Sequence, residues 1–215
     1  MNWITKPPLL LRLFYPSVLW RCKTSKKEVF LTFDDGPVPG VTPWVLDILT
    51  NYGACGTFFC VGDNIRKYPG VFSQLVNSGN EAATHGFSHK PGNRLGIESY
   101  LKDIDLGLQY NAKARWFRPP HGFIYPWWVS HIRAKGVGIA MWDVLSGDYD
   151  RNLSPDKVIQ NVIKHIRPGS LIVFHDSLKA WPNLKIALPA VLDWMSKNGY
   201  TTNFLSSINQ NKRIL

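Results

Sequence analysis

Short apolar runs alternate with amphipathic, helix-like segments along most of this 215-residue chain. Repeated strand–helix units connect through right-handed crossovers, which produce a parallel sheet. About six or seven such units predict an α/β fold in the form of a small, incomplete (β/α) barrel. An open, doubly wound sheet is the alternative, but the sequence contains neither of its phosphate-loop signatures, GxGxxG or GxxxxGK[ST].

The strands are predicted from apolar runs, and the helices from their caps and periodicity. Thr42-Pro43 and Ser154-Pro155 each place a good N-cap before a proline, which predicts two helix starts. Helices are predicted over 42–49, 71–77, 98–110, 154–165 and 184–197. Strands are predicted at Val29–Phe33, Thr57–Val61, a short run ending at Thr84, Trp116–Phe117, Ile139–Trp142, Ser170–Phe174 and Tyr200–Phe204.

The composition excludes several classes of protein. Hydrophobic residues make up 45 % of the chain, which suffices for a sizeable core and excludes a disordered chain. The formal net charge is +10, but its densest cluster is only Lys23, Lys26 and Lys27, so we expect no nucleic-acid partner. Three cysteines exclude a disulfide-stapled scaffold. Cys55 and Cys60 lie in an apolar run and are expected to be buried, reduced thiols.

The apolar segment Leu9–Trp20 (LLLRLFYPSVLW) is interrupted by Arg12 and Pro16. It is too short to span a bilayer, and no small-residue cleavage site follows it. We therefore expect residues 1–27 to pack on or near a barrel domain formed by 28–215, with no transmembrane span or cleavable signal. A cytoplasmic or membrane-peripheral location is favoured over secretion, and a peripheral membrane contact through this basic, Trp-bearing stretch stays open. The oligomeric state is not predicted.

Polar side chains follow most of the predicted strands. Each one alone has a structural explanation, such as a turn or a satisfied histidine at a sheet edge. In a parallel barrel, however, the carboxyl ends of the strands converge on one face, where the active site lies. The polar residues that lie at or shortly after the ends of predicted strands are Asp34, Asp35, His85, His89, Arg118, Asp148, His175 and Asp176.

The residue types in this set indicate a metal. The H-x-x-x-H spacing of His85 and His89 would place both imidazoles on one face of a helical turn. One of Asp34 and Asp35 completes a set of two histidines and one carboxylate, which leaves open positions for water and substrate. Such a set suits catalytic zinc, and also Fe(II) or Mn(II).

The remaining polar residues are typical of acid–base machinery. The second aspartate can take a proton from a metal-activated water, and Arg118 beside it would keep it ionised and oriented. His175 can protonate a leaving group, with Asp148 raising its pKa and fixing its tautomer. Together these residues predict metal-assisted hydrolysis of an amide or an ester.

Five ordered motifs between Glu28 and Phe204 resemble those of polysaccharide deacetylases, the NodB-homology domain of carbohydrate esterase family 4. The resemblance implies a distorted (β/α)7-type barrel that removes acetyl groups from N-acetylated sugars, sugar precursors or polysaccharides. It also implies one divalent metal ion, with zinc first and cobalt, nickel, manganese or iron as alternatives. The motifs are Thr32-Phe-Asp-Asp-Gly-Pro37, His85-Gly-Phe-Ser-His89, Arg118-Pro-Pro-His-Gly122, Leu145-Ser-Gly-Asp-Tyr149 and Val173-Phe-His175.

The same resemblance implies a role for each motif residue. Asp34 would be the general base, oriented by Arg118, and His175 the general acid, tuned by Asp148. The backbone N–H of His121 would polarise the acyl carbonyl. The implied metal ligands are Asp35, His85 and His89, and the candidate substrate contacts are Pro120, His121, Tyr149 and Trp181. Tyr125, Trp127 and Trp128 follow the third motif and Trp181 the fifth; sugar stacking in the groove and packing in the core stay open for each of them, whereas Gly62-Asp63-Asn64 is expected to cap a helix.

This chain departs from the family pattern at several positions. Gly86 replaces the usual Ser or Thr, which could loosen the metal-binding loop, and His121 replaces an aromatic residue. Leu145 and Tyr149 replace an aspartate and a tryptophan, and Val173 replaces leucine. Two alternatives to N-deacetylation therefore stay open: an O-acetyl esterase acting on acetylated xylan-type glycans, and a catalytically weak glycan-binding pseudoenzyme.

Overall fold

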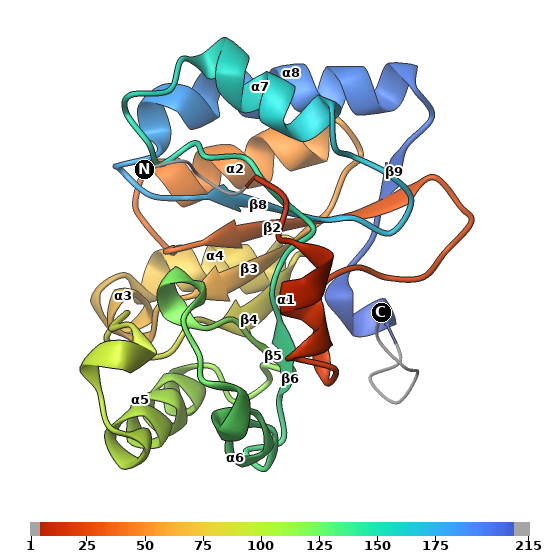
Figure 1. Ribbon diagram of the computed structural model, residues 1–215. Helices are drawn as coiled ribbons and strands as arrows, with labels where there is room; N and C mark the ends of the chain where they lie inside the picture. Colours follow the sequence, from red (N-terminus) through yellow and green to blue (C-terminus); the bar gives the residue numbers. More distant parts are fainter. Residues whose placement is uncertain (1–4, 209–215) are drawn as a thin grey trace.

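The computed structural model describes residues 5–208, and a single curled sheet runs through them (Figure 1). Its strands are ordered β1-β6-β5-β4-β3-β2-β8-β7, and β9 pairs with β2 outside this path. All pairings between these strands are parallel, which confirms the predicted barrel-type α/β fold. The strands are β1 (Val18–Leu19), β2 (Glu28–Asp34), β3 (Gly56–Cys60), β4 (Glu81–Thr84), β5 (Trp116–Phe117), β6 (Gly138–Ala140), β7 (Val144–Leu145), β8 (Leu171–His175) and β9 (Thr201–Thr202).

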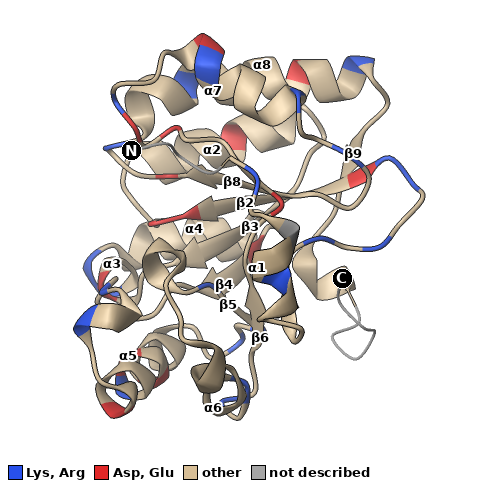
Figure 2. Ribbon diagram, in the orientation of Figure 1, with Lys and Arg blue, Asp and Glu red and all other residues tan. Residues whose placement is uncertain are grey.

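Helices cover the outer face of the sheet (Figure 1). Lys and Arg residues are spread over these helices and the loops between them (Figure 2). Five of the helices, α2, α3, α4, α7 and α8, contribute buried residues to one apolar cluster with β2 and β8. The α-helices are α1 (Leu9–Leu13), α2 (Val41–Asn51), α3 (Gly62–Lys67), α4 (Pro69–Asn77), α5 (Ile97–Tyr110), α6 (Val129–Arg133), α7 (Pro155–Ile163) and α8 (Trp181–Lys197). The 3-10 helices are η1 (Gly92–Arg94), η2 (Pro120–Gly122), η3 (Pro126–Trp128) and η4 (Leu205–Ser207).

The central strands are apolar on both faces because both faces are buried. On β2, Leu31 packs toward the helices, whereas its neighbour Phe30 belongs to a second cluster inside the curl. Seven strands contribute to that inner cluster, together with the segment after β9. Its buried members are Leu19, Phe30, Phe59, Ala83, Trp116, Ala140, Leu171 and Leu205.

The N-terminal segment bridges the two ends of the sheet. Within residues 5–208, no pairing joins β1 directly to β7. Instead, the carbonyl of Thr5 accepts a hydrogen bond from the N–H of Leu145 in β7, at 2.8 Å. Farther along the segment, β1 pairs with β6, and the N–H of Cys22 donates to the carbonyl of Gly169 at 2.8 Å. The segment therefore helps to close the barrel.

A buried charge cluster holds this segment in place. Asp143 is fully buried and accepts from Arg12 at 2.7 Å and from Arg167 at 2.8 Å. Burial alone would raise the pKa of Asp143, but the hydrogen bonds from Arg167, Arg12 and Ser170 lower it to about 2. The carboxylate is thus ionised at neutral pH and partners two arginines.

Replacing Asp143 with Ala is expected to lower the free energy of unfolding by about 3–5 kcal/mol, because Arg12 stays buried without its partner. Chemical denaturation measures this change. The matched control is Asp193→Ala, which breaks an exposed pair with Lys197 and should cost about 0.5 kcal/mol or less. Equal costs for the two variants would contradict the bridging role of Asp143.

The structure corrects several predicted element boundaries. Helix α2 begins after Gly40, so the prediction of Thr42 as its N-cap is wrong. The prediction that Ser154 caps α7 is confirmed, because its hydroxyl accepts from the N–H of Lys157. Helix α8 starts at Trp181, three residues before the predicted Leu184, and the short strands β1 and β7 were not predicted.

The apolar N-terminal stretch divides into two parts. Val18 and Trp20 are buried, whereas Leu10 and Leu13 on α1 and Phe14 at its C-cap are more than two thirds exposed. None of the helices described is long and apolar enough to cross a membrane. A peripheral membrane contact through this stretch stays a prediction.

The cysteines agree with the predicted reduced state. Cys22, Cys55 and Cys60 are all free thiols. Cys60 is buried, as predicted, whereas Cys55 is only partly buried.

Candidate active site

Three potential metal ligands meet where β2 and β4 end. Asp35 follows β2, and His85 and His89 follow β4. The Nε2 atoms of His89 and His85 lie 3.0 and 3.8 Å from Oδ1 of Asp35. One ligand atom from each residue lies within 4.8 Å of the others, so the three side chains surround one point.

The chemistry of these donors fits a divalent metal ion. Nδ1 of His85 lies 2.7 Å from the carbonyl oxygen of Arg118, which fixes the proton on Nδ1 and leaves Nε2 free to bind. Burial lowers the pKa of His85 to about 4, so its imidazole is neutral at neutral pH. Burial raises the pKa of Asp35, but a hydrogen bond with His89 and the nearby histidines keep it below the usual value. A three-ligand set of this kind leaves coordination positions open, as catalytic metal sites do.

The two histidines lie on a loop, so the prediction that a helical turn aligns them is wrong. Gly86 and His89 both have left-handed backbone conformations, with φ of 75° and 56°. Asp35 is also left-handed, with φ of 78°. This conformation is uncommon for residues other than glycine, so the loops depend on support from their surroundings.

Asp103 on α5 supplies part of that support. Its two carboxylate oxygens accept hydrogen bonds from the N–H groups of Phe87 and Ser88, at 2.9 and 3.0 Å. A Cβ atom at Gly86 would lie 2.7 Å from Oδ2 of Asp103. In this chain a glycine at position 86 therefore leaves room for a carboxylate that holds the metal-binding loop. Sequence reasoning missed Asp103 because it lies on a helix with no motif of its own.

Replacing Asp103 with Ala is expected to weaken zinc affinity by about 10–100-fold, as losses of outer-shell partners do. Competition titration with a chromogenic chelator measures this affinity. The matched control is Asp105→Ala on the same helix, which removes only the contact with Lys135. An unchanged zinc affinity in the folded Asp103 variant would show that the loop needs no such support.

Two further residues hold the turn after β2. Asp176 is fully buried, and its carboxylate accepts from the N–H of Gly36 at 3.1 Å and from the hydroxyl of Thr42 at 2.6 Å. Thr42 therefore serves this turn and not the start of α2. The side-chain amide of Asn64 donates to the carbonyl of Asp35 at 2.7 Å. Gly62-Asp63-Asn64 form the first turn of α3, whose N-cap is Val61 with no side-chain cap hydrogen bond, so the prediction that this triplet caps a helix is wrong.

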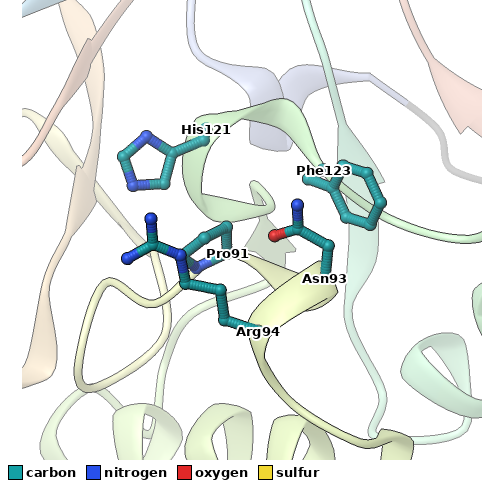
Figure 3. A pocket seen from close by; sticks show the side chains of 5 residues that line it. All are labelled: Pro91, Asn93, Arg94, His121 and Phe123. Atoms are coloured by element: carbon teal, nitrogen blue, oxygen red, sulfur yellow. The ribbon is translucent and has the colours of Figure 1, made fainter.

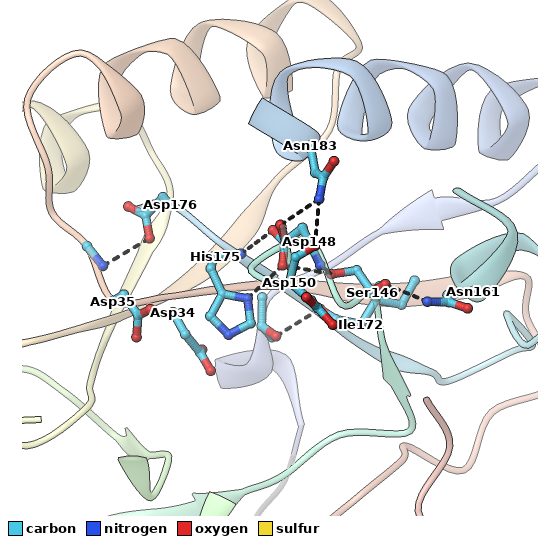
Figure 4. A network of polar contacts seen from close by, with 12 residues as sticks. Asp34, Asp35, Ser146, Asp148, Asp150, Asn161, Ile172, His175, Asp176 and Asn183 are labelled. Carbon is cyan, nitrogen blue, oxygen red and sulfur yellow. Dashed lines mark hydrogen bonds and ion pairs between the residues drawn. The ribbon is translucent and has the colours of Figure 1, made fainter. Parts of the chain in front are cut away.

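Asp34 is buried against Arg118, as the sequence predicted for a base and its orienting cation (Figure 4 shows Asp34). Nη1 of Arg118 donates to Oδ1 of Asp34 at 2.7 Å and to the hydroxyl of Thr32 at 2.8 Å. Its remaining donors bond to the carbonyls of Ala140 and Met141. The guanidinium is thus fixed on every side, and Asp34 is held at the end of β2.

His175, at the end of β8, pairs with Asp148 (Figure 4). Nδ1 of His175 donates to Oδ1 of Asp148 at 2.8 Å, and its backbone N–H donates to Oδ2 at 2.8 Å. The hydroxyl of Ser146 also donates to Asp148, at 3.0 Å. Burial lowers the pKa of His175, but the charge and hydrogen bond of Asp148 raise it to about 9. The ring of Tyr149 lies edge-on to His175, with centroids 4.6 Å apart.

The predicted substrate-contact residues divide between the site and the core. His121 lies beside the metal ligands, with its ring 4.7 Å from that of His89, and Pro120 is buried next to it. Trp181 packs edge-on against Trp44, 5.0 Å away, at the start of α8. Trp128 is buried in a core cluster. Trp127 is 65 % exposed and stacks on Tyr125, which leaves its other face available.

Comparisons with known proteins agree on one family. The polysaccharide deacetylase family model matches residues 21–137. A peptidoglycan-N-acetylglucosamine deacetylase of Bacillus cereus is 29 % identical over 190 residues, covering 85 % of this chain and 88 % of that protein. A chitooligosaccharide deacetylase of Sinorhizobium fredii is 30 % identical over 171 residues, covering 77 % of this chain and 79 % of that protein.

A solved structure shows the same fold. It is a peptidoglycan N-acetylglucosamine deacetylase in complex with 4-naphthalen-1-yl-N-oxidanyl-benzamide, with a TM-score of 0.86 and 26 % identity. The match covers 97 % of this chain and 100 % of that one. From these matches and the motifs gathered at the strand ends, it follows that this chain belongs to the polysaccharide deacetylase family.

Proposed function

We propose that this protein is a divalent-metal-dependent hydrolase that removes acetyl groups from an N-acetylated sugar or polysaccharide. One observation carries the proposal. The three potential metal ligands lie close to two buried pairs, Asp34 with Arg118 and His175 with Asp148. One pair can accept a proton and the other can donate one, as amide hydrolysis requires.

Each residue has a distinct task in this reaction. A divalent ion held by Asp35, His85 and His89 would acidify a water molecule and polarise the acyl carbonyl. Asp34 accepts the proton of that water, while Arg118 orients the carboxylate through its hydrogen bond to Oδ1. His175 then donates a proton from Nε2 to the departing amine, while Asp148 holds its Nδ1.

The backbone at His121 supports the acyl group. Its left-handed conformation, with φ of 56°, turns the chain sharply beside the metal ligands. Its N–H is thereby a candidate donor to the oxygen that becomes negatively charged in the transition state. We expect zinc as the ion, because two histidines and one carboxylate are typical of catalytic zinc.

The substrate is expected to be a glycan containing N-acetylglucosamine, as for the relatives' peptidoglycan and chitooligosaccharide substrates. Acetate release from chitotetraose, peptidoglycan fragments and acetylated xylan tests this expectation. Release from an N-acetylated glycan, and little from xylan, supports the proposal. Release from xylan alone would show an esterase, and binding of these glycans without any release would show a glycan-binding protein.

A further inference from the structure

A small pocket adjoins the proposed catalytic centre (Figure 3). It lies between the loop after β4 and the loop after β5, and we call it the anion pocket. Its volume is about 310 Å³. Its lining residues are Pro91, Asn93, Arg94, His121 and Phe123.

The anion pocket lies next to the potential metal ligands. The ring of His121 forms one of its walls, and that ring is 4.7 Å from the ring of His89. In Figure 3 the guanidinium of Arg94 and the imidazole of His121 lie close together on one side of the pocket. A group bound there would therefore belong to the sugar undergoing reaction or to its direct neighbour.

The backbone around the anion pocket is built tightly, so the pocket is preformed. A Cβ atom at Gly92 would lie 3.0 Å from the ring of Trp128 and 3.1 Å from the carbonyl oxygen of Phe123. On the other loop, a Cβ atom at Gly122 would lie 2.3 Å from the ring of Trp142. Glycine at these two positions lets the loops pack closely, and the approach of Gly92 to Phe123 holds η1 against the segment that follows η2.

The anion pocket is lined by a cationic side chain, Arg94, and by no acidic one. Arg94 is exposed and forms no ion pair among residues 5–208, although its charge acts on His121. Asn93 adds an amide. Pro91 and Phe123 add apolar surface beside these donors. An arginine fork next to an apolar wall suits a carboxylate carried on a short aliphatic arm.

We propose that this pocket binds a carboxylate of the substrate through Arg94, so that the enzyme prefers acidic N-acetylated glycans to neutral ones. The inference rests on the proposed deacetylase function. The carboxylate can be carried on the N-acetylated sugar itself, as an ether-linked lactyl group, or on a neighbouring uronic acid. Both present the same anion to the guanidinium.

The test compares matched substrates that differ only in charge. An N-acetylglucosamine–N-acetylmuramic acid tetrasaccharide is used with its lactyl carboxylates free and with the same groups converted to amides. An oligosaccharide alternating N-acetylglucosamine with glucuronic acid, and its amide, form the second arm. We expect kcat/KM for acetate release to be about tenfold higher for the free carboxylate in at least one arm, as for a partly exposed charge-assisted hydrogen bond. The arm that responds identifies the position of the carboxylate.

Substituting Arg94 tests the residue assignment. Arg94→Gln is expected to reduce the ratio of carboxylate to amide kcat/KM to about one, mainly through KM, since the contact is made in substrate binding. The matched control is Arg133→Gln, an exposed arginine on α6 outside the pocket lining, which should keep the wild-type ratio. A loss of folding would lower both rates without changing the ratio. A wild-type ratio of about one in both arms, or an unchanged ratio in an Arg94→Gln enzyme whose thermal unfolding midpoint matches that of the wild type, would overturn the proposal.

Calorimetric binding separates a failure of this proposal from a failure of the proposed function. If no substrate releases acetate, the deacetylase proposal fails, and the affinities of the same free and amidated oligosaccharides are compared directly. Tighter binding of the carboxylate that Arg94→Gln abolishes would still support the anion pocket. Equal affinities would overturn it.

Discussion

Replacing Asp34 with Asn is expected to lower kcat for acetate release by about 10³-fold, the typical contribution of a general base. The amide has nearly the shape of the carboxylate but cannot accept the proton of the attacking water. Arg118 is fully buried and donates to Asp34 at 2.7 Å, and an amide oxygen can still accept that hydrogen bond. The loss should therefore fall on chemistry and not on substrate binding, with KM little changed.

Three measurements accompany this variant. Its thermal unfolding midpoint and zinc affinity show whether the fold and the metal site survive the change. The matched control is Asp156→Asn, an exposed aspartate in the first turn of α7, which should keep wild-type activity. A folded, metal-binding Asp34→Asn enzyme that retains more than about a tenth of wild-type kcat would rule out Asp34 as the base.

Replacing His175 with Gln is expected to cost about 10²–10⁴-fold in kcat, because the departing amine then lacks its proton donor. A substrate with a better leaving group tests the role selectively. An aryl acetate ester needs little protonation of its leaving group, so the variant should lose much less activity on it than on an N-acetyl sugar. Equal losses on both substrates would point to a structural role for His175.

The pH profile gives an independent test of the same residue. Asp148 raises the pKa of His175 to about 9, so the protonated donor persists above neutral pH and activity should fall as the pH rises through about 9. In Asp148→Asn this fall should begin at lower pH. Burial lowers the pKa of His175, and the variant lacks the carboxylate charge that raises it. The interaction of protonated His175 with Asp148 also stabilises the folded protein. This contribution is fully present below the ordinary pKa of histidine, about 6.5, and is lost as the pH rises through about 9. An alkaline limb at the same pH in both enzymes would exclude His175 as the titrating acid.

Much of the fold could be predicted from local patterns. The apolar runs that end at Phe33, Thr84 and Phe117 all lie in strands, because continuous apolar sequence is what a doubly covered parallel strand requires. Since strand ends in a parallel sheet share one face, Asp34, Asp35 and His175 could also be predicted to meet. The motif resemblance added the role of each residue.

Other features depend on contacts between distant residues, which a single sequence does not encode locally. Thr42 is a good N-cap by residue type, but its hydroxyl donates to Asp176 across the fold. The two-residue strands β1 and β7 have no periodicity to detect, and they exist only because neighbouring segments pair with them. Asp103 supports the metal-binding loop from helix α5, but an aspartate in an amphipathic helix gives no local sign of such a contact.

The central claim is that acetate release depends on one divalent ion at Asp35, His85 and His89. The most direct test removes metal from the purified protein by chelation, measures acetate release from an N-acetylglucosamine oligomer, and then adds zinc back. The account predicts release below about 1 % of the starting rate without metal, and recovery at about one equivalent of zinc per chain. It also predicts that His89→Ala, which removes a ligand, fails to recover at that zinc concentration. Undiminished acetate release from metal-free protein would contradict the account.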